Sequence, residues 1–140
     1  MNTTDKPKSI FVYGTLKKTG VRHHLWPCFP VRIIKARIRG TLFDLGPYPA
    51  LTLSGTDWIE GERWEIADED MSETLRMLDN IEGYGAQADD LYERCIIDCI
   101  DEDDSVHPAF TYQFAQSEKL DSARRIPPNA KGVCSWPESA

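Results

Sequence analysis

The sequence feature that most constrains the fold is a short apolar run that stops at a glycine, residues 10–13 (Ile-Phe-Val-Tyr) followed by Gly14. β-Branched residues flank an aromatic one in this run, which is typical of a strand buried on both faces. Glycine lets the backbone turn sharply and approach another group closely, so the strand is expected to end at Gly14. The amides of Gly14, Thr15 and Leu16 then lie outside any sheet ladder, where they can bind an anion or a developing oxyanion. Taken alone, the same stretch also fits a core strand followed by a tight turn with no functional role.

The length and charge of the chain limit its architecture and its partners. With 140 residues the chain fits a single domain, 1–140, that buries a core without disulfide or metal staples. We expect the core over residues 10–114, with terminal segments at 1–9 and 115–140. The net charge of −7 argues against binding to a phosphate backbone, which needs a basic face. The sequence therefore predicts no nucleic-acid partner.

The cysteines and the first residues indicate the compartment. Residues 1–9 are polar, unlike a signal peptide. No apolar run approaches the roughly 20 residues that a membrane-spanning helix needs. The cysteines lack CxxC spacing, which argues against both a disulfide framework and a ribbon-type zinc site: Cys28, Cys95, Cys99 and Cys134. The sequence therefore predicts a reduced, cytoplasmic protein that binds no membrane.

Two sequence features invite a metal-binding interpretation. His23 and His24 are adjacent, but neighbouring side chains point in different directions on a helix or a strand, so they are not expected to share a ligand. The acidic run 101–104 lacks the spacing of a calcium loop and is predicted to be a solvated turn. We therefore predict no metal site.

Most of the chain reads as β-strands separated by turns. Strands are predicted where β-type residues alternate between glycine- and proline-containing turns. They are expected at 38–45, at 49–53 as a short edge strand, at 58–66 after a turn at 54–57, and at 92–100 and 107–114 as a hairpin. Two acids in this set are ambiguous, because Glu60 and Glu62 share one side of their strand with Trp58 and Trp64. They fit either general acid/base chemistry or solvation at a twisted or bulged edge.

One helix is predicted between the strands. Asp70 and Glu73 have the spacing of a capping box, and apolar residues recur at helical spacing at Met71, Leu75 and Leu78. The next step of that stripe falls on an acid, Glu82. The helix is expected to stop there because glycines follow at 83 and 85.

Glu82 is therefore placed on the buried face at the C-terminal end of a helix. The helix dipole is negative there and desolvation opposes ionisation, so both effects are expected to raise the pKa of Glu82. A raised pKa makes a glutamate a usable base near neutral pH. The alternative is that the last turn frays and Glu82 points into water.

These features occur together, in the same order, in a known family. The matching segments are Tyr13-Gly14-Thr15-Leu16 followed by His24-Leu25, Leu45-Gly46-Pro47-Tyr48-Pro49-Ala50-Leu51, Gly61-Glu62, Leu78-Asp79-Asn80-Ile81-Glu82-Gly83-Tyr84, and Tyr92-Glu93-Arg94. Together they resemble the γ-glutamylcyclotransferase-like superfamily, also called the AIG2-like family. The resemblance runs from about Ile10 to Phe114.

The resemblance implies an α+β fold, a small mixed β-barrel with one main helix packed against it. It implies a cofactor-independent enzyme in which the α-amine of a γ-glutamyl amine or peptide attacks its own side-chain amide, giving 5-oxoproline and a free amine. Glu82 is then the catalytic acid/base and residues 13–16 (Tyr13, Gly14, Thr15 and Leu16) cradle the substrate. Tyr92, Arg94 and Tyr112 are further candidates for binding the substrate carboxylate. The expected partner is this small molecule, and the expected state is a monomer or a homodimer.

Two other functions fit the sequence. The chain can be a non-catalytic domain that binds or senses a small molecule in the same cavity. It can also be a protein whose partner surface includes the acidic run 101–104. Release of 5-oxoproline that depends on Glu82 distinguishes the enzyme from both.

Overall fold

Five strands form a closed barrel in the computed structural model, which describes residues 7–18, 20, 23–85 and 90–136. Around the barrel the order is β2-β4-β5-β1-β3, and pairing of β2 with β3 closes the ring. The short strands β6 and β7 extend the sheet beyond β2 and β3. The elements are β1 (Ser9–Val12), η1 (His23–Leu25), β2 (Arg32–Asp44), β3 (Pro49–Glu65), α1 (Asp68–Glu82), β4 (Tyr92–Asp101), β5 (Val106–Phe114), η2 (Ser117–Leu120), β6 (Arg124–Arg125) and β7 (Val133–Cys134).

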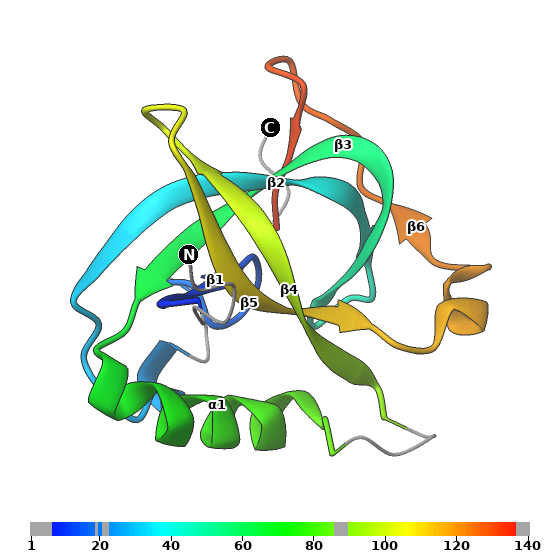
Figure 1. The fold of residues 1–140 in the computed structure, drawn as a ribbon. Coiled ribbons are helices and arrows are strands. Elements are labelled where there is room, and N and C mark those ends of the chain that lie inside the picture. Colours follow the sequence, from blue (N-terminus) through cyan, green and yellow to red (C-terminus); the bar gives the residue numbers. More distant parts are fainter. Residues whose placement is uncertain (1–6, 19, 21–22, 86–89, 137–140) are drawn as a thin grey trace.

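The predicted fold class is confirmed. Figure 1 shows α1 lying across the lower end of the barrel in that view, with the β4–β5 hairpin rising on the opposite side. Within the described part of the chain, α1 is the single α-helix. The arrangement is the expected α+β fold, a small mixed β-barrel covered by one main helix.

The strand β1 is buried on both faces, as its sequence predicts. All four of its residues are buried. It lies between β3, to which it is antiparallel, and β5, to which it is parallel. Ile10 and Val12 pack in the cluster that α1 covers, whereas Phe11 packs in the cluster inside the barrel. The strand therefore joins the two parts of the core.

The prediction of two strands separated by a turn at 54–57 is wrong. The chain forms one strand, β3, which pairs with β2 along its length. The pairing shifts register between Gly40 and Thr41, which face Asp57 and Thr52. The residues between these partners form a bulge, and Gly55 has a φ of +104°. The Ser-Gly-Thr sequence suits a bulge as well as a turn because both need glycine with positive φ. Also, β2 begins at Arg32, earlier than the predicted strand at 38–45.

The helix α1 begins earlier than predicted. The N-cap residue is Ala67 and no side chain caps the helix, so the expected capping box of Asp70 and Glu73 is wrong. Glu73 instead pairs with Arg76 on the helix surface. The first turn consists of three acids, residues 68–70, which the positive end of the helix dipole stabilises. This explains a start at Asp68 without a side-chain cap.

The apolar stripe and the end of the helix are as predicted. Leu78 is fully buried, and Met71 and Leu75 pack against the same cluster. Gly83 follows Glu82 in the left-handed conformation, with a φ of 69°. Glycine adopts this conformation at no steric cost, so it ends the helix.

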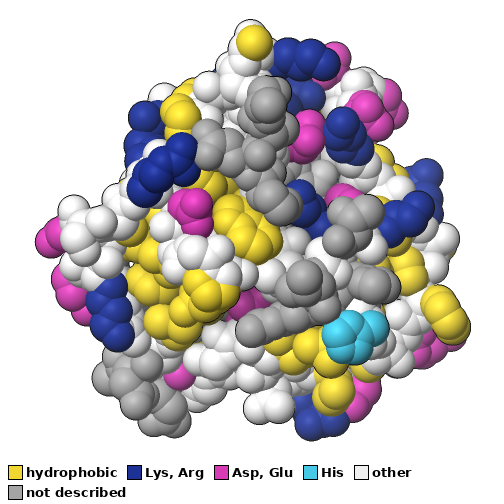
Figure 2. Space-filling view, turned by 180° about the vertical axis from the view of Figure 1, so that it is seen from behind, with side chains coloured by type: hydrophobic (Ala, Val, Ile, Leu, Met, Phe, Trp, Pro, Cys, Tyr) yellow, Lys and Arg dark blue, Asp and Glu magenta, His cyan; other side chains and the backbone are white. Residues whose placement is uncertain are grey.

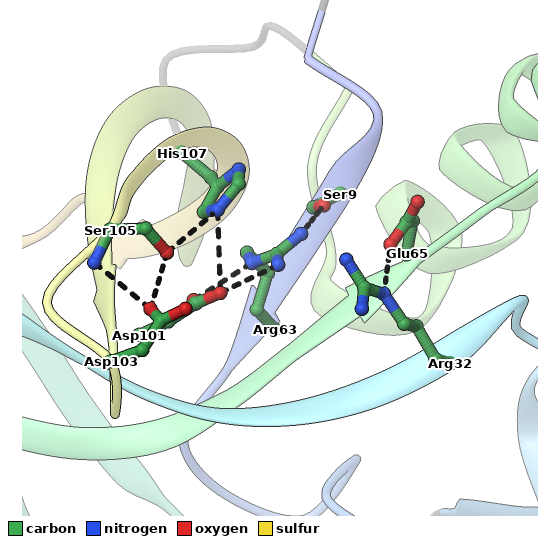
Figure 3. Close-up of polar contacts among 8 residues, drawn as sticks. All are labelled: Ser9, Arg32, Arg63, Glu65, Asp101, Asp103, Ser105 and His107. Carbon is green, nitrogen blue, oxygen red and sulfur yellow. Dashed lines mark hydrogen bonds and ion pairs between the residues drawn. The ribbon is translucent and has the colours of Figure 1, made fainter.

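The sequence predicts that the acidic run 101–104 is a solvated turn, and this prediction is wrong for Asp101. Asp101 is 5% exposed and its carboxylate pairs with Arg63, which is 2% exposed (Figure 3). Arg63 donates from Nε and Nη2 to both oxygens of Asp101, at 3.0 and 2.8 Å, and from Nη1 to Ser9 at 2.7 Å. The Nε2 atom of His107 lies 3.4 Å from Asp101. The other acids, including Asp104, are exposed. The run therefore contributes a buried ion pair that ties β4 to β3 and β1.

Charged side chains of both signs share the surface. On the face drawn in Figure 2, lysine and arginine side chains lie beside aspartate and glutamate. Within the described residues, no helix is long and apolar enough to cross a membrane.

Candidate functional site

A cavity of about 240 Å³ lies where β1 ends beside the C-terminal end of α1. It is lined by residues from β1 and the following turn, from the segment before β3, from the end of α1 and from β4 and β5. These are Phe11, Val12, Tyr13, Gly14, Thr15, Leu16, Tyr48, Pro49, Ile81, Glu82, Gly83, Leu91, Tyr92 and Tyr112. The cavity therefore brings Glu82 together with the stretch that follows the strand 10–13.

The glycine turn supplies backbone amides to the cavity wall. Within the described residues, the amides of Gly14, Thr15 and Leu16 donate to no protein acceptor. The next amide, that of Lys17, closes the turn by donating to the carbonyl of Gly14 at 3.1 Å. A Cβ atom on Gly14 would lie 2.8 Å from the Cγ atom of Pro49, so only glycine fits without a shift of that ring. These amides are suited to hold an anion.

Two tryptophans and Glu62 hold the far side of this turn. Trp26 donates from Nε1 to the carbonyl of Leu16 at 2.9 Å, and its ring stacks on Trp64 at 4.0 Å and 5°. Trp64 donates from Nε1 to Glu62 at 3.1 Å. The same oxygen of Glu62 accepts the amide of Lys18 at 2.7 Å. The backbone on the C-terminal side of Leu16 is therefore fixed by two hydrogen bonds.

Glu60 and Glu62, for which the sequence permits either a catalytic or a solvated role, are not among the described residues that line this cavity. Glu62 accepts the bonds described above, and Glu60 pairs with Lys35 at 3.5 Å. Both line a separate groove with Lys17 and Lys18. The structure gives Glu62 a place in supporting the turn.

Glu82 is the last residue of α1 and is half-buried. Ile81 and Gly83, on either side of it, also line the cavity. The amide of Gly83 bonds to the carbonyls of Asp79 and Asn80, so the helix is closed directly after Glu82. The last turn is thus folded against the cavity, and the role of Glu82 in catalysis stays a prediction.

Three tyrosines of the cavity donate their hydroxyl hydrogens to the protein. Tyr13 donates to the carbonyl of Tyr112 at 2.6 Å, and Tyr92 donates to the carbonyl of Pro49 at 2.7 Å. Tyr112 donates to Asp79 at 2.6 Å. A phenol has one hydrogen, so each offers the cavity its ring and oxygen lone pairs. Donation from Tyr92 or Tyr112 to a substrate carboxylate, as the sequence suggests, requires one of these bonds to be broken.

The charge of Glu82 reaches two of these phenols. The pKa of Tyr13 is raised well above its ordinary value, and burial is the largest cause. The charges of Tyr92 and Glu82 add to this shift. Burial and the hydrogen bond to Asp79 raise the pKa of Tyr112, and the charge of Glu82 adds to this shift. Both phenols therefore stay protonated at neutral pH.

Arg94 is placed behind the cavity wall. It is not among the residues that line the cavity in the described part of the chain. Its Nη1 atom donates to Asp79 at 2.7 Å. Its predicted contact with a substrate carboxylate stays a prediction, and Asp79 competes for the same guanidinium.

Asp79 is the residue that sequence reasoning missed. It accepts hydrogen bonds from both Tyr112 and Arg94, although the sequence pattern assigns it no role of its own. Its position three residues before Glu82 was the available signal, because residues three apart lie on the same side of a helix.

No metal centre is found in the residues that the structure covers. Among them, no group of three or more histidine, cysteine, aspartate or glutamate side chains is arranged to hold a metal ion. All four cysteines are free thiols.

Comparisons with known proteins match this chain over most of its length. A family model described as gamma-glutamyl cyclotransferase, AIG2-like, matches residues 10–131. The gamma-L-glutamyl-butirosin B gamma-glutamyl cyclotransferase of Niallia circulans is 31% identical over 118 residues, which are 81% of this chain and 71% of that protein.

Solved structures share the architecture. YkqA of Bacillus subtilis superposes over 86% of this chain with a TM-score of 0.62 and 23% identity, and the chain spans 38% of the length of YkqA. An AIG2-like protein of Mus musculus superposes over 79% of each chain with a TM-score of 0.59 and 22% identity. At these identities the two structures show that the barrel and its covering helix are a shared fold.

Proposed function

The chain belongs to the AIG2-like gamma-glutamyl cyclotransferase family, and we propose that it is an enzyme that releases 5-oxoproline from a γ-glutamyl amine or peptide. The observation that carries the proposal is the shared cavity. Glu82 and the turn residues Gly14, Thr15 and Leu16 line it together, although almost 70 residues separate them in the chain. A carboxylate opposite backbone N–H groups provides a base and an oxyanion site for acyl transfer.

The first step is ring closure within the substrate. The neutral α-amine attacks the carbon of the side-chain amide, and a new C–N bond forms. Glu82 takes one hydrogen of the attacking amine as a proton. The carbonyl oxygen becomes an oxyanion, which the amides after the strand β1 stabilise by roughly 3 kcal/mol per good donor.

The second step releases the amine. The C–N bond to the leaving amine breaks as the carbonyl reforms, and Glu82 returns its proton to the leaving nitrogen. The products are 5-oxoproline and a free amine, and Glu82 is again a carboxylate. One glutamate therefore serves as base and then as acid. Since nucleophile and electrophile belong to one molecule, the site needs only to fold them together.

The size of the cavity supports a small substrate group. Its 240 Å³ is below the range of about 300–1,000 Å³ that is usual for drug-sized ligands. A glutamyl group therefore fits a cavity of this size better than a drug-sized ligand does. We propose that the glutamyl end enters the cavity with the leaving amine toward solvent, and that Tyr92, Arg94 and Tyr112 contribute to holding it. The free cysteines support the proposal of a cytoplasmic protein.

The test is an incubation of the purified protein with a panel of γ-glutamyl amines and peptides, with 5-oxoproline measured by chromatography. We expect release from at least one compound, and we expect Glu82→Gln to abolish it without loss of folding. Glu60→Gln is the matched control, because Glu60 is a half-buried carboxylate of the barrel outside the cavity and should leave the rate unchanged. Equal release by the wild type and Glu82→Gln would reject the assigned role of Glu82. Retention of an unaltered ligand without release would instead favour a binding domain.

A further inference from the structure

The mechanism does not explain a second carboxylate beside the cavity, that of Asp79. Its side chain is 22% exposed and both of its oxygens are occupied. One oxygen accepts the hydroxyl of Tyr112 at 2.6 Å, and the other accepts Nη1 of Arg94 at 2.7 Å. Hydrogen bonds to a charged acceptor are the stronger kind, so these contacts fix the side chain firmly.

The contacts of Asp79 join α1 to two strands of the barrel. Tyr112 comes from β5 and Arg94 from β4. The guanidinium of Arg94 also lies 5.6 Å from the ring of Phe110 and 5.8 Å from the ring of Tyr84, within the range of cation–π contacts. The side chain of Asp79 thus connects the last turn of α1 to two strands of the barrel, in addition to the apolar packing of Leu78 and Ile81.

The main chain of Asp79 holds the same turn. Its carbonyl accepts the amide of Tyr84 at 2.8 Å, and it also accepts the amide of Gly83. Glu82 lies between Asp79, whose side chain contacts β4 and β5, and Gly83 and Tyr84, whose amides close the helix. Its backbone is therefore fixed on both sides by Asp79.

Tyr112 lines the same cavity as Glu82. It donates to Asp79, and the charge of Glu82 acts on it as well. Because the phenol has a single hydrogen, its donation to Asp79 means that it does not donate to Glu82. A hydrogen bond from this phenol would stabilise the charged form of Glu82 and weaken it as a base.

We propose that Asp79 is a positioning residue for Glu82, because it binds the last turn of α1 to the barrel and keeps the hydrogen of the Tyr112 hydroxyl on its own carboxylate. The inference rests on the proposed function. It predicts a specific electrical effect: without the charge of Asp79, Glu82 ionises at lower pH. The charged and titratable groups near Glu82 include Asp79 on α1, Tyr13 after β1, Tyr92, Arg94 and Cys95 on β4, Tyr112 on β5 and Tyr48 before β3.

The first test compares Asp79→Asn with the wild type. The variant keeps the size of the side chain, loses its charge and leaves Arg94 without its anionic partner. We expect kcat to fall about tenfold with KM changed less than about threefold, since the loss concerns the reacting geometry. The acid limb of the kcat/KM profile should move to lower pH. Glu73→Gln is the matched control, an acid-to-amide change at the exposed ion pair with Arg76 on the same helix, and it should change neither quantity.

The second test does not depend on turnover. The protein is labelled with ¹³C at the glutamate carboxyl carbon, and the Glu82 signal is identified by its absence in Glu82→Gln. Its titration midpoint should fall in Asp79→Asn and stay in place in Glu73→Gln. If no variant releases 5-oxoproline, the proposed function fails, and the titration still decides whether Asp79 acts on Glu82. A folded Asp79→Asn variant with an unmoved titration midpoint overturns the inference, even where its rate is lower.

Discussion

The buried pair of Arg63 and Asp101 allows a quantitative prediction of stability. Asp101→Ala leaves a guanidinium that is 2% exposed without its anion. Removing one partner of a buried ion pair costs about 3–5 kcal/mol. For a chain of 140 residues the entropy of unfolding is about 0.3 kcal/mol per kelvin, so the melting temperature should fall by about 10–17 °C.

The measurement is thermal unfolding followed by circular dichroism or calorimetry at pH 7. Asp104→Asn is the control, because Asp104 lies in the same acidic run but pairs with Arg37 at the surface, and asparagine tolerates the φ of 69° at this position. An exposed pair contributes about 0–1 kcal/mol, so the control should lower the melting temperature by no more than about 3 °C.

A double variant distinguishes the destabilisation caused by an unpaired buried charge from that caused by the smaller side chain. Replacing both partners, as in Arg63→Met with Asp101→Leu, removes the uncompensated charge and should recover part of the stability, since apolar replacements of buried pairs are often neutral. The reasoning is refuted if Asp101→Ala melts within about 3 °C of the wild type, or if the double variant is no more stable than Asp101→Ala.

Three further outcomes are expected. Gly14→Ala should lower kcat/KM at least about tenfold, because the added Cβ would lie 2.8 Å from the ring of Pro49 and the turn must shift. Unchanged kinetics would show that the close approach of Gly14 to Pro49 is not needed for activity. Trp26→Phe keeps an aromatic ring on Trp64 but removes the donor to the Leu16 carbonyl. We expect kcat/KM to fall about fivefold, which corresponds to the loss of one hydrogen bond. Unchanged kinetics would show that this hydrogen bond does not support the turn. Burial raises the pKa of Cys99 to about 12, so a thiol reagent at pH 8 should modify it in unfolded but not in folded protein, as read by mass spectrometry, and rapid labelling of the folded chain would contradict its burial.

The features that sequence reasoning located depend on local patterns. The burial of β1 follows from three apolar residues in a row, and the position of Glu82 follows from a stripe of 3.6-residue period. Both patterns are complete within one element, so no knowledge of partners is needed. The meeting of Glu82 with Gly14 came from the family resemblance, because nothing local to either stretch specifies the other.

The features that were missed depend on partners far away in the chain. Asp101 sits among exposed acids, and its burial is decided by Arg63, which lies 38 residues earlier. The continuous strand β3 is decided by its pairing with β2, because the same Ser-Gly-Thr sequence fits a turn or a bulge. In each case the residue types permit two states, and tertiary contacts select one.

Asp79 and Glu82 show how one helix turn can give two carboxylates different surroundings. Asp79 accepts one hydrogen bond from a cation, Arg94, and one from a phenol, Tyr112. Glu82 lies at the negative end of the helix dipole and lines a cavity, and Tyr112, which lines the same cavity, gives its hydrogen to Asp79. A carboxylate that accepts two side-chain hydrogen bonds and the carboxylate proposed to exchange a proton therefore stand three residues apart. The proposed chemistry assigns proton transfer to Glu82, which lines the cavity, and positioning to Asp79, which is not among the described residues that line it.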